Sequence, residues 1–396
     1  MNKKILITAI IAAMVLDVFY FVPGCYARTT RKQKKETFYM KAAQAEMDSK
    51  KYTLAIDYYS KVIELNPENS EAYTKRGNAK NLLGQYKEAI EDYTKALELD
   101  PNRENAYYNR GIAKSNLNAY DEVLDDYTKE LELNPENVNA YLNRGITEVM
   151  LNKYDEAIDD FTKAAELDIN NENAYYNRGL AKRAKHDYEG AIKDYSKVIE
   201  LNHNNIDAYN NCGVAKYYLK DYNGAIKDYS KVIELNKNFK RVYYNRALAY
   251  LGLKKYEDAL EDFSQEILIN PDYDLAYYDR GLVQYKLEYY QAAIEDYTKA
   301  IELNPQNADY YFDRGALISR TGGDLKKAEE DLSKAIKLDN KDPEKYLIRA
   351  TIYCKSGLYL AAVDDLNIAL NLDHNNKQAY ELRSFAIKSL TKEQQE

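Results

Sequence analysis

The sequence predicts an all-α fold, an α-solenoid of stacked helical hairpins, and two observations support that prediction. An Ala-Tyr pair or a close variant returns every 34 residues, as at Tyr107, Tyr141 and Tyr175. Within each unit, apolar and small side chains recur three or four positions apart, which places them on one face of a helix. Helices this short are unstable alone, so we expect neighbouring units to stabilise one another by stacking.

The N-terminal residues have the pattern of a targeting segment. Two lysines precede an apolar stretch, residues 5–22, which Asp17 interrupts and Pro23 follows. A basic start before a short apolar stretch is typical of an export signal, so residues 1–27 are predicted to be a signal peptide or a membrane anchor. The residues before Cys25 resemble a bacterial lipobox, although Pro23 departs from it. Cys25 is therefore a candidate for lipidation, and the alternatives of a cleaved signal, a lipoprotein and an uncleaved anchor stay open.

Charge divides the chain into a basic neck and an acidic body. Residues 28–37 form a predicted basic linker that can lie against anionic lipid headgroups. The whole chain carries a net charge of −8, which argues against nucleic acid as a partner. We expect a cell-envelope protein, exported or membrane-anchored and bacterial. The positive-inside rule favours a cytoplasmic body if the segment is retained, so the side of the membrane stays open.

Ten repeats of helix, turn, helix and turn are predicted over residues 38–378. Their bounds are 38–71, 72–105, 106–139, 140–173, 174–207, 208–241, 242–275, 276–309, 310–344 and 345–378. The ninth unit is one residue longer, and the extra residue falls near the turn at Gly322 and Gly323. Residues 379–396 are predicted to form a capping helix and a tail.

This pattern resembles the tetratricopeptide repeat (TPR) family. The aromatic residue that opens the motif is Tyr in every unit, and a small residue such as Gly111 follows it in the first helix. The second helix carries its own small residue, such as Ala157, and a closing proline, such as Pro101, ends several units. The resemblance implies a right-handed superhelix whose first helices line a concave surface, and a function in protein–protein interaction.

Charged residues at two repeating positions predict an internal ladder of ion pairs. An Arg precedes the small residue of the first helix, and an Asp precedes the aromatic position of the second helix. The arginines are Arg76, Arg110, Arg144, Arg178, Arg246, Arg280, Arg314 and Arg349, with Arg383 in the last helix. We expect them to pair with the aspartates between packed helices and so to fix the register of the hairpins. The alternative is an arginine row that recognises acidic ligands.

Three further residues, Glu130, Glu266 and Cys212, depart from the repeat pattern, and Cys354 lies in the tenth unit. Glu130 and Glu266 replace a small residue of the second helix. We expect both to reach solvent or a nearby Arg, the alternative being a slight opening between units. Cys212 and Cys354 are expected to be packing residues, too far apart for a disulfide within one monomer.

The residues beside the core face of the first helices predict a peptide-binding groove. The candidates are Tyr108, Asn109, Ile112, Leu142, Asn143, Ile146, Tyr176, Asn177, Leu180, Asn210, Asn211, Val214, Tyr217, Tyr244, Asn245, Leu248, Tyr278, Leu282, Tyr285 and Phe312. Such an apolar, tyrosine-rich stripe suits an extended peptide or a helix, and the asparagines can bond its backbone. Lysines needed for the carboxylate clamp of chaperone-binding TPR proteins are absent from the matching positions. The alternative is burial of the stripe between adjacent first helices.

No motif in the sequence proposes a reaction, a metal or a cofactor. The His and Cys residues lack metal-ligand spacing, and the repeats leave no room for a catalytic domain. We therefore predict a non-catalytic scaffold that binds a partner polypeptide in the groove. A co-chaperone-like or secretion-related peptide receptor is one alternative, and self-assembly through the repeats is another.

Overall fold

A computed structural model of the protein describes residues 25–393, and it describes their side chains from Arg31 to Lys392. This part of the chain consists of helices and turns and contains no strand. The predicted targeting segment lies outside the described residues except for its last three positions, which begin α2. The side chain of Cys25 is likewise outside the described part. The predicted basic linker, residues 28–37, is helical and continuous with the rest of α2.

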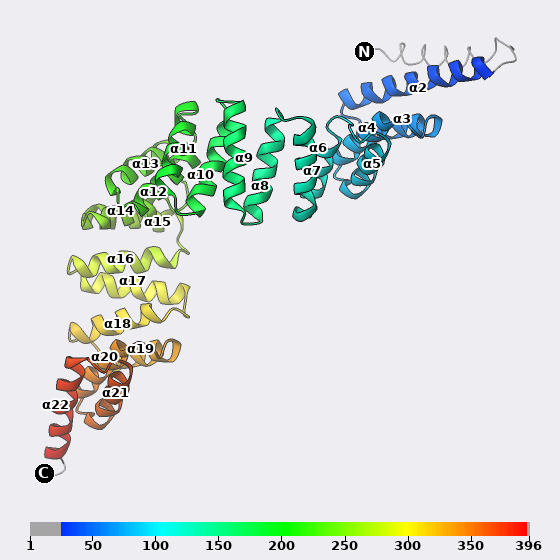
Figure 1. The fold of residues 1–396 in the computed structure, drawn as a ribbon. Helices are drawn as coiled ribbons and strands as arrows, with labels where there is room; N and C mark the ends of the chain where they lie inside the picture. The colour runs from blue at the N-terminus through cyan, green and yellow to red at the C-terminus, as the bar shows by residue number, and fades with distance from the viewer. Residues whose placement is uncertain (1–24, 394–396) are drawn as a thin grey trace. The chain divides into compact units, whose positions relative to one another are not determined.

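The described chain divides into two compact units, and the first ends at Lys185. Its helices succeed one another as packed antiparallel pairs (Figure 1). They are α2 (Cys25–Asp48), α3 (Tyr52–Leu65), α4 (Ser70–Leu82), α5 (Tyr86–Leu99), α6 (Ala106–Ser115), α7 (Tyr120–Leu133), α8 (Val138–Met150), α9 (Tyr154–Leu167) and α10 (Glu172–Ala184).

The second unit begins at His186 and has the same alternation of first and second helices. Its helices are α11 (Tyr188–Leu201), α12 (Ile206–Tyr218), α13 (Tyr222–Leu235), α14 (Val242–Gly252), α15 (Tyr256–Ile269), α16 (Asp274–Lys286), α17 (Tyr290–Leu303), α18 (Ala308–Arg320), α19 (Leu325–Leu338), α20 (Pro343–Lys355), α21 (Tyr359–Leu372) and α22 (Lys377–Glu393). The all-α solenoid architecture is thus confirmed for each unit.

Small residues allow the paired helices to approach closely, as the sequence predicts. Gly111 of α6 lies under the ring of Tyr127 from α7, and a Cβ at Gly111 would come within 2.7 Å of that ring. Gly145 and Phe161 have the same relationship in the next hairpin. Each aromatic ring is buried, and it packs against the backbone of the facing helix within a cluster that also contains several buried alanines.

Asparagine caps start many of the first helices. In α4, α8, α10 and α12 the residue before the helix is Asn, and its side chain accepts a hydrogen bond from a backbone N–H of the first turn. Arg103 and Phe239 stand at the corresponding positions before α6 and α14. Those two helices start late, after Asn105 and Arg241 in the left-handed conformation, and neither has a side-chain cap.

Glu130 and Glu266 belong to those two hairpins, and both are buried rather than solvent-exposed. Glu266 is 0% exposed and accepts a hydrogen bond of 3.0 Å from the backbone N–H of Arg241, at the start of α14. Glu130 is 2% exposed and accepts one of 2.9 Å from Nδ2 of Asn137. The expectation that both reach solvent or a nearby Arg is therefore wrong as to solvent, and of the two only Glu266 is seen to meet an Arg, through the backbone N–H of Arg241. Glu266 supplies the missing cap of α14 from the partner helix, because its anionic oxygens satisfy free N–H groups there.

Among the described residues, no helix combines the length and the apolar composition that a membrane crossing requires.

Candidate functional site

The predicted ladder of ion pairs is present in both units. In the first, Arg144 donates from Nε and Nη2 to the two carboxylate oxygens of Asp160, at 2.7 Å each. In the second, Arg246 makes the same two bonds to Asp262, also at 2.7 Å. The other pairs are Arg76–Asp92, Arg110–Asp126, Arg280–Asp296, Arg314–Asp331 and Arg349–Asp365. These guanidinium groups are bound to buried internal carboxylates, which disfavours the alternative of a row for acidic ligands.

Each ladder arginine also reaches the preceding hairpin. Nη1 of Arg144 donates to the hydroxyl of Thr128 at 3.0 Å, and Nη1 of Arg246 donates to that of Ser230 at 2.9 Å. The guanidinium of Arg144 also lies over the ring of Tyr141. One arginine therefore links two hairpins and the tyrosine that opens its own unit. The sequence analysis missed these hydroxyls, although a Ser or Thr recurs at that position with the period of the repeat.

The predicted groove residues lie on α6, α8 and α10 of the first unit and on α12, α14, α16 and α18 of the second. Most of them are half-buried. Leu142 and Asn211 are buried, whereas Ile146 is exposed. Within each unit the stripe thus presents part of most of its side chains to solvent. Their role in binding stays a prediction.

Several tyrosines of the stripe are bonded to the next first helix. The hydroxyl of Tyr244 donates to Asp279 at 2.6 Å, and that of Tyr278 donates to Asp313 at 2.6 Å. Burial and the neighbouring carboxylate raise the pKa of Tyr244, so its phenol stays protonated as a donor. For these hydroxyls the structure therefore favours the alternative stated above, in which the stripe packs between adjacent first helices. Sequence reasoning missed both aspartates, which follow the opening tyrosine by two positions, where other units have Asn.

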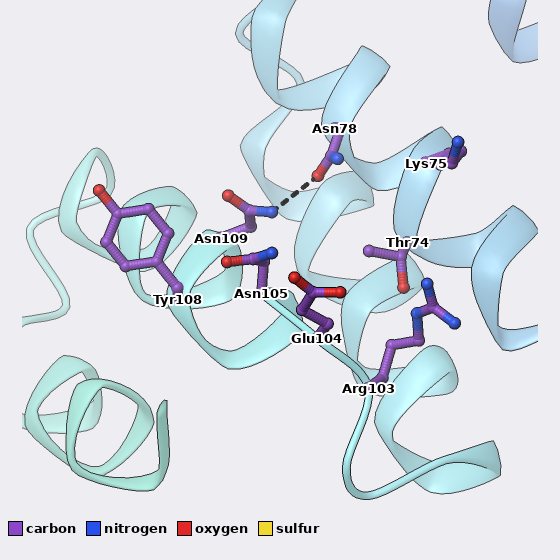
Figure 2. Close-up of a pocket in the computed structure, with 8 residues that line it drawn as sticks. All are labelled: Thr74, Lys75, Asn78, Arg103, Glu104, Asn105, Tyr108 and Asn109. Carbon is purple, nitrogen blue, oxygen red and sulfur yellow. Dashed lines mark hydrogen bonds between the residues drawn. The ribbon is translucent and has the colours of Figure 1, made fainter. Parts of the chain in front are cut away.

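The first unit contains a pocket of about 300 Å³ between α4, α6 and the turn that joins α5 to α6. Its lining is Thr74, Lys75, Asn78, Arg103, Glu104, Asn105, Tyr108 and Asn109. Figure 2 shows Lys75 and Arg103 on one side, Tyr108 on the other, and the amides between them. The lining thus combines two cations with one anion, Glu104, and with amide groups and a phenol, and Lys75 also pairs with Glu71 at 3.3 Å. Such a concave site, with one more cation than anion in its lining, can bind an acidic or amide group of a peptide.

Two polar groups of the pocket differ in how they are satisfied. Asn109 donates from Nδ2 to Oδ1 of Asn78 at 3.1 Å, so these two amides orient each other (Figure 2). Nε of Arg103 is buried and has no hydrogen-bond partner. A buried donor without a partner costs free energy, which an incoming acceptor would recover. Sequence reasoning found Tyr108 and Asn109 but missed Arg103. The signal that could have found it is that Arg103 occupies the position where other units have the Asn that caps the first helix.

The groove of the second unit offers an unpaired acceptor. Oδ1 of Asn210, on α12, is buried and has no hydrogen-bond partner. A peptide N–H is the kind of donor that would satisfy it.

The described residues offer little reactive chemistry. No group of three His, Cys, Asp or Glu side chains in this part of the chain is arranged to hold a metal ion. Cys212 and Cys354 are both free, as expected for residues that do not bridge. Burial raises the pKa of the Cys212 thiol to about 12, so it is a packing group rather than a nucleophile.

Models of tetratricopeptide repeats match the chain at many places along its length. One, described as TPR repeat, matches residues 77–118 and 179–220. Others, described as tetratricopeptide repeat, match residues 36–69, 58–91, 138–171, 206–239, 241–273, 275–307 and 296–330. The chain belongs to the tetratricopeptide repeat family. The TPR fold identifies it as a scaffold for protein–protein interaction.

Several solved TPR structures are similar to this chain. YrrB, described as a TPR protein with an unusual peptide-binding site, has 26% identity and a TM-score of 0.44, with 50% of this chain and 97% of YrrB covered. A TPR protein from Parabacteroides merdae has 19% identity and a TM-score of 0.46, with 63% and 99% covered. Yeast Tom70 has 18% identity and a TM-score of 0.39, with 92% and 97% covered. No curated protein matches the chain in sequence.

Proposed function

We propose that this TPR chain is a non-catalytic scaffold that binds partner polypeptides along its first helices, with one anchoring point at the pocket between α4 and α6. The observation that carries the proposal is the unpaired buried Nε of Arg103 beside Lys75 and two paired amides. An acidic side chain of the partner would bind between the two cations, while Tyr108 supplies apolar contact area at low entropic cost.

Photo-crosslinking in producing cells tests this site. Benzoylphenylalanine replaces Tyr108 in one strain and the exposed Lys95 of α5 in a control strain, and adducts are identified by mass spectrometry. We expect a discrete polypeptide adduct at position 108 and none at 95. Lys75→Glu together with Arg103→Glu should reduce that adduct about tenfold. Equal adducts at both positions, or an adduct that the two charge reversals leave unchanged, would refute the site.

The N-terminus would tether this scaffold to the cell envelope, through a signal or anchor over residues 1–27 and lipid on Cys25. The proposal rests on the basic and apolar pattern of those residues and on the cations that follow them. Labelling with radioactive palmitate, compared between the natural chain and Cys25→Ser, tests it directly. Label that enters the natural chain alone supports lipidation. Absence of label, with the chain in the soluble fraction and its N-terminus intact, would contradict the tether.

A further inference from the structure

In three hairpins a lysine near the end of the first helix binds the ladder aspartate of the second helix. The distances between Nζ and Oδ2 are 2.7 Å for Lys80–Asp92, 3.0 Å for Lys114–Asp126 and 2.7 Å for Lys216–Asp228. In the first two, Nζ also donates to a backbone carbonyl in the first turn of the second helix, that of Glu88 at 3.3 Å and that of Glu122 at 3.4 Å. We call the place that these Nζ atoms occupy the ammonium position.

The hairpin of α8 and α9 has the same oxygen atoms around this position but carries Glu148 in place of the lysine. Asp160 and Glu156 follow Glu148 by twelve and eight positions, as the corresponding residues follow the lysine elsewhere. Among the described residues, the carboxylate of Asp160 accepts hydrogen bonds from Arg144 alone. In the hairpin of α4 and α5, Oδ2 of Asp92 binds both the ladder arginine and the lysine. The carboxylate of Asp160 thus lacks the second cation that Asp92 has.

Glu148 is buried without a partner. The residue is 7% exposed, and its Oε2 is buried and has no hydrogen-bond partner. A buried acceptor without a donor costs free energy, which an incoming donor would recover. The ammonium position also borders the surface, because the side chains of Lys80, Lys114 and Lys216 are 14–21% exposed. A donor from another molecule can therefore reach it.

The charges around the ammonium position balance in a neighbouring hairpin but not in this one. Those of the hairpin of α6 and α7 are Arg110, Lys114, Glu122 and Asp126. Those of the hairpin of α8 and α9 are Arg144, Glu148, Lys153, Glu156 and Asp160. Two cations thus face two anions in the first hairpin, and two cations face three anions in the second. Burial and the charge of Asp160 raise the pKa of Glu148 to about 8, so a proton supplies the missing positive charge at lower pH.

We propose that the hairpin of α8 and α9 binds a primary ammonium group of another molecule at the ammonium position, between Glu148, Asp160 and the backbone carbonyl of Glu156. The chain's own lysines show that this group fits these oxygen atoms. Here it would make charge-assisted hydrogen bonds to two carboxylates instead of one, and such bonds are about twice as strong as neutral ones. A lysine side chain of a bound polypeptide and a free polyamine both carry such a group. The site shares no residue with the pocket between α4 and α6, so it does not depend on the function proposed for that pocket.

The probe is n-butylammonium, which has the length and the charge of a lysine side chain. Methyl NMR spectra of the full chain at pH 8.5 follow its binding, with Ile146, Ala157 and Ile158 of α8 and α9 as reporters. Tetramethylammonium holds the ionic strength constant, because it carries the same charge but donates no hydrogen bond. We expect saturable shifts of these reporters with n-butylammonium and none with tetramethylammonium. Circular dichroism checks that each variant remains folded.

Variants of Glu148 test which group binds the probe. Glu148→Lys supplies its own ammonium group and should abolish binding, whereas Glu148→Gln removes the negative charge and should weaken binding at least tenfold. Glu136→Lys makes the same charge change as Glu148→Lys at an exposed position of the turn between α7 and α8, and it should leave binding unchanged. For the natural chain, lowering the pH from 8.5 to 6.5 should weaken binding more than tenfold, because Glu148 then holds a proton.

A gain of binding at a second hairpin gives an independent test. Lys114→Glu, introduced into the Glu148→Lys chain, leaves Asp126 and the carbonyl of Glu122 without their lysine. We expect n-butylammonium to bind this double variant, with the shifts now in methyl groups of α6 and α7.

Two further ligands distinguish the sources of the ammonium group. Nα-acetyl-lysine methylamide represents a lysine of a polypeptide, and we expect it to bind within threefold of n-butylammonium if a polypeptide is the source. Spermidine represents a polyamine. If a polyamine is the source, spermidine should bind at least tenfold more tightly than n-butylammonium, because its other ammonium groups can meet the exposed Glu156 and Asp159 of α9.

Four results would overturn the proposal. The first is the absence of saturable shifts in α8 and α9 with n-butylammonium at pH 8.5, and the second is a response that Glu148→Lys leaves unchanged. The third is an equal response to tetramethylammonium, which would show only a general attraction of cations to an acidic surface. The fourth is a site that admits n-butylammonium but meets neither expectation for the lysine derivative and spermidine.

Discussion

Lys216 binds Asp228 through a hydrogen bond of 2.7 Å between its Nζ and the carboxylate, inside the hairpin of α12 and α13. The ladder arginine of this hairpin is replaced by Cys212, which is 1% exposed. A single lysine therefore neutralises the buried aspartate here, without the bond to the preceding hairpin that an arginine provides.

Restoring the arginine should stabilise the second unit. In the hairpin of α4 and α5, Arg76 and Lys80 both bind Asp92, so the geometry accepts two cations on one carboxylate. We expect Cys212→Arg to raise the free energy of unfolding by about 1 kcal/mol, the usual gain of an additional hydrogen bond. Thermal unfolding with hydrogen exchange in α12 and α13 measures it. Cys212→Ala is the control, and an arginine variant no more stable than the alanine variant would contradict the prediction.

Glu148 gives a second prediction, because a carboxylate stands where hairpins on either side of it along the chain have Lys80, Lys114 and Lys182. It is 7% exposed, and its Oε2 is buried without a hydrogen-bond partner. Burial, and then the charge of Asp160, raise its pKa from 4.5 to about 8. Glu148→Lys should replace this repulsion with an ion pair to Asp160 and stabilise the first unit by about 2 kcal/mol at pH 8.

The pH dependence follows from the direction of that shift. A raised pKa means that the folded chain holds the proton more tightly than the unfolded chain. The stability that the tightly held proton of Glu148 gives to the folded chain is complete below about pH 4.5, and it is lost as the pH rises to about 8. The advantage of Glu148→Gln over the natural chain should therefore grow across this range, as measured by urea unfolding at several pH values. Glu136→Gln, at an exposed position of the turn between α7 and α8, removes the same single charge as a control, and an equal gain from it would refute the explanation.

Tyr278→Phe separates the structural role of the groove tyrosines from any role in binding. The substitution removes the donor to Asp313 and leaves a half-buried carboxylate without its partner on α16. We expect a loss of about 1–2 kcal/mol in the free energy of unfolding, by thermal or urea denaturation. Tyr289→Phe, at a residue 56% exposed, should cost less than about 0.5 kcal/mol. Equal effects would show that the bond to Asp313 contributes nothing.

The sequence is informative about contacts within a hairpin and much less so about contacts between hairpins. The pairing of Arg144 with Asp160 was predictable because both residues recur with the period of the repeat and lie on facing sides of two consecutive helices. The bond from Tyr244 to Asp279 was not, because it joins first helices of different units, and helical spacing does not say which of their side chains meet.

Departures from the repeat were the hardest to interpret. In the sequence, Glu266 looks like a charge at an apolar position of a second helix. Its role becomes clear only because α14 lacks an Asn cap and Glu266 accepts the hydrogen bond from the start of that helix. Likewise, Arg103 looks like a surface residue of a turn, and only the late start of α6 places it in the pocket. The division of the chain after Lys185 falls inside the fifth predicted repeat, where the sequence pattern continues without a break.

The turn between first and second helix yields the last prediction. Its residue is left-handed in many units, with φ of 58° at Lys254, 62° at Glu288 and 74° at Gly322. That conformation costs a residue with a Cβ about 1–2 kcal/mol, whereas glycine adopts it freely but loses about 0.5–1 kcal/mol more entropy on folding. The strain is the larger of the two, so Lys254→Gly should stabilise the second unit by about 0.5 kcal/mol in urea unfolding. Gly322→Ala is the converse, because its Cβ would contact nothing within 4 Å and would add only strain. It should destabilise by a similar amount, and a gain in stability from the alanine would contradict the argument.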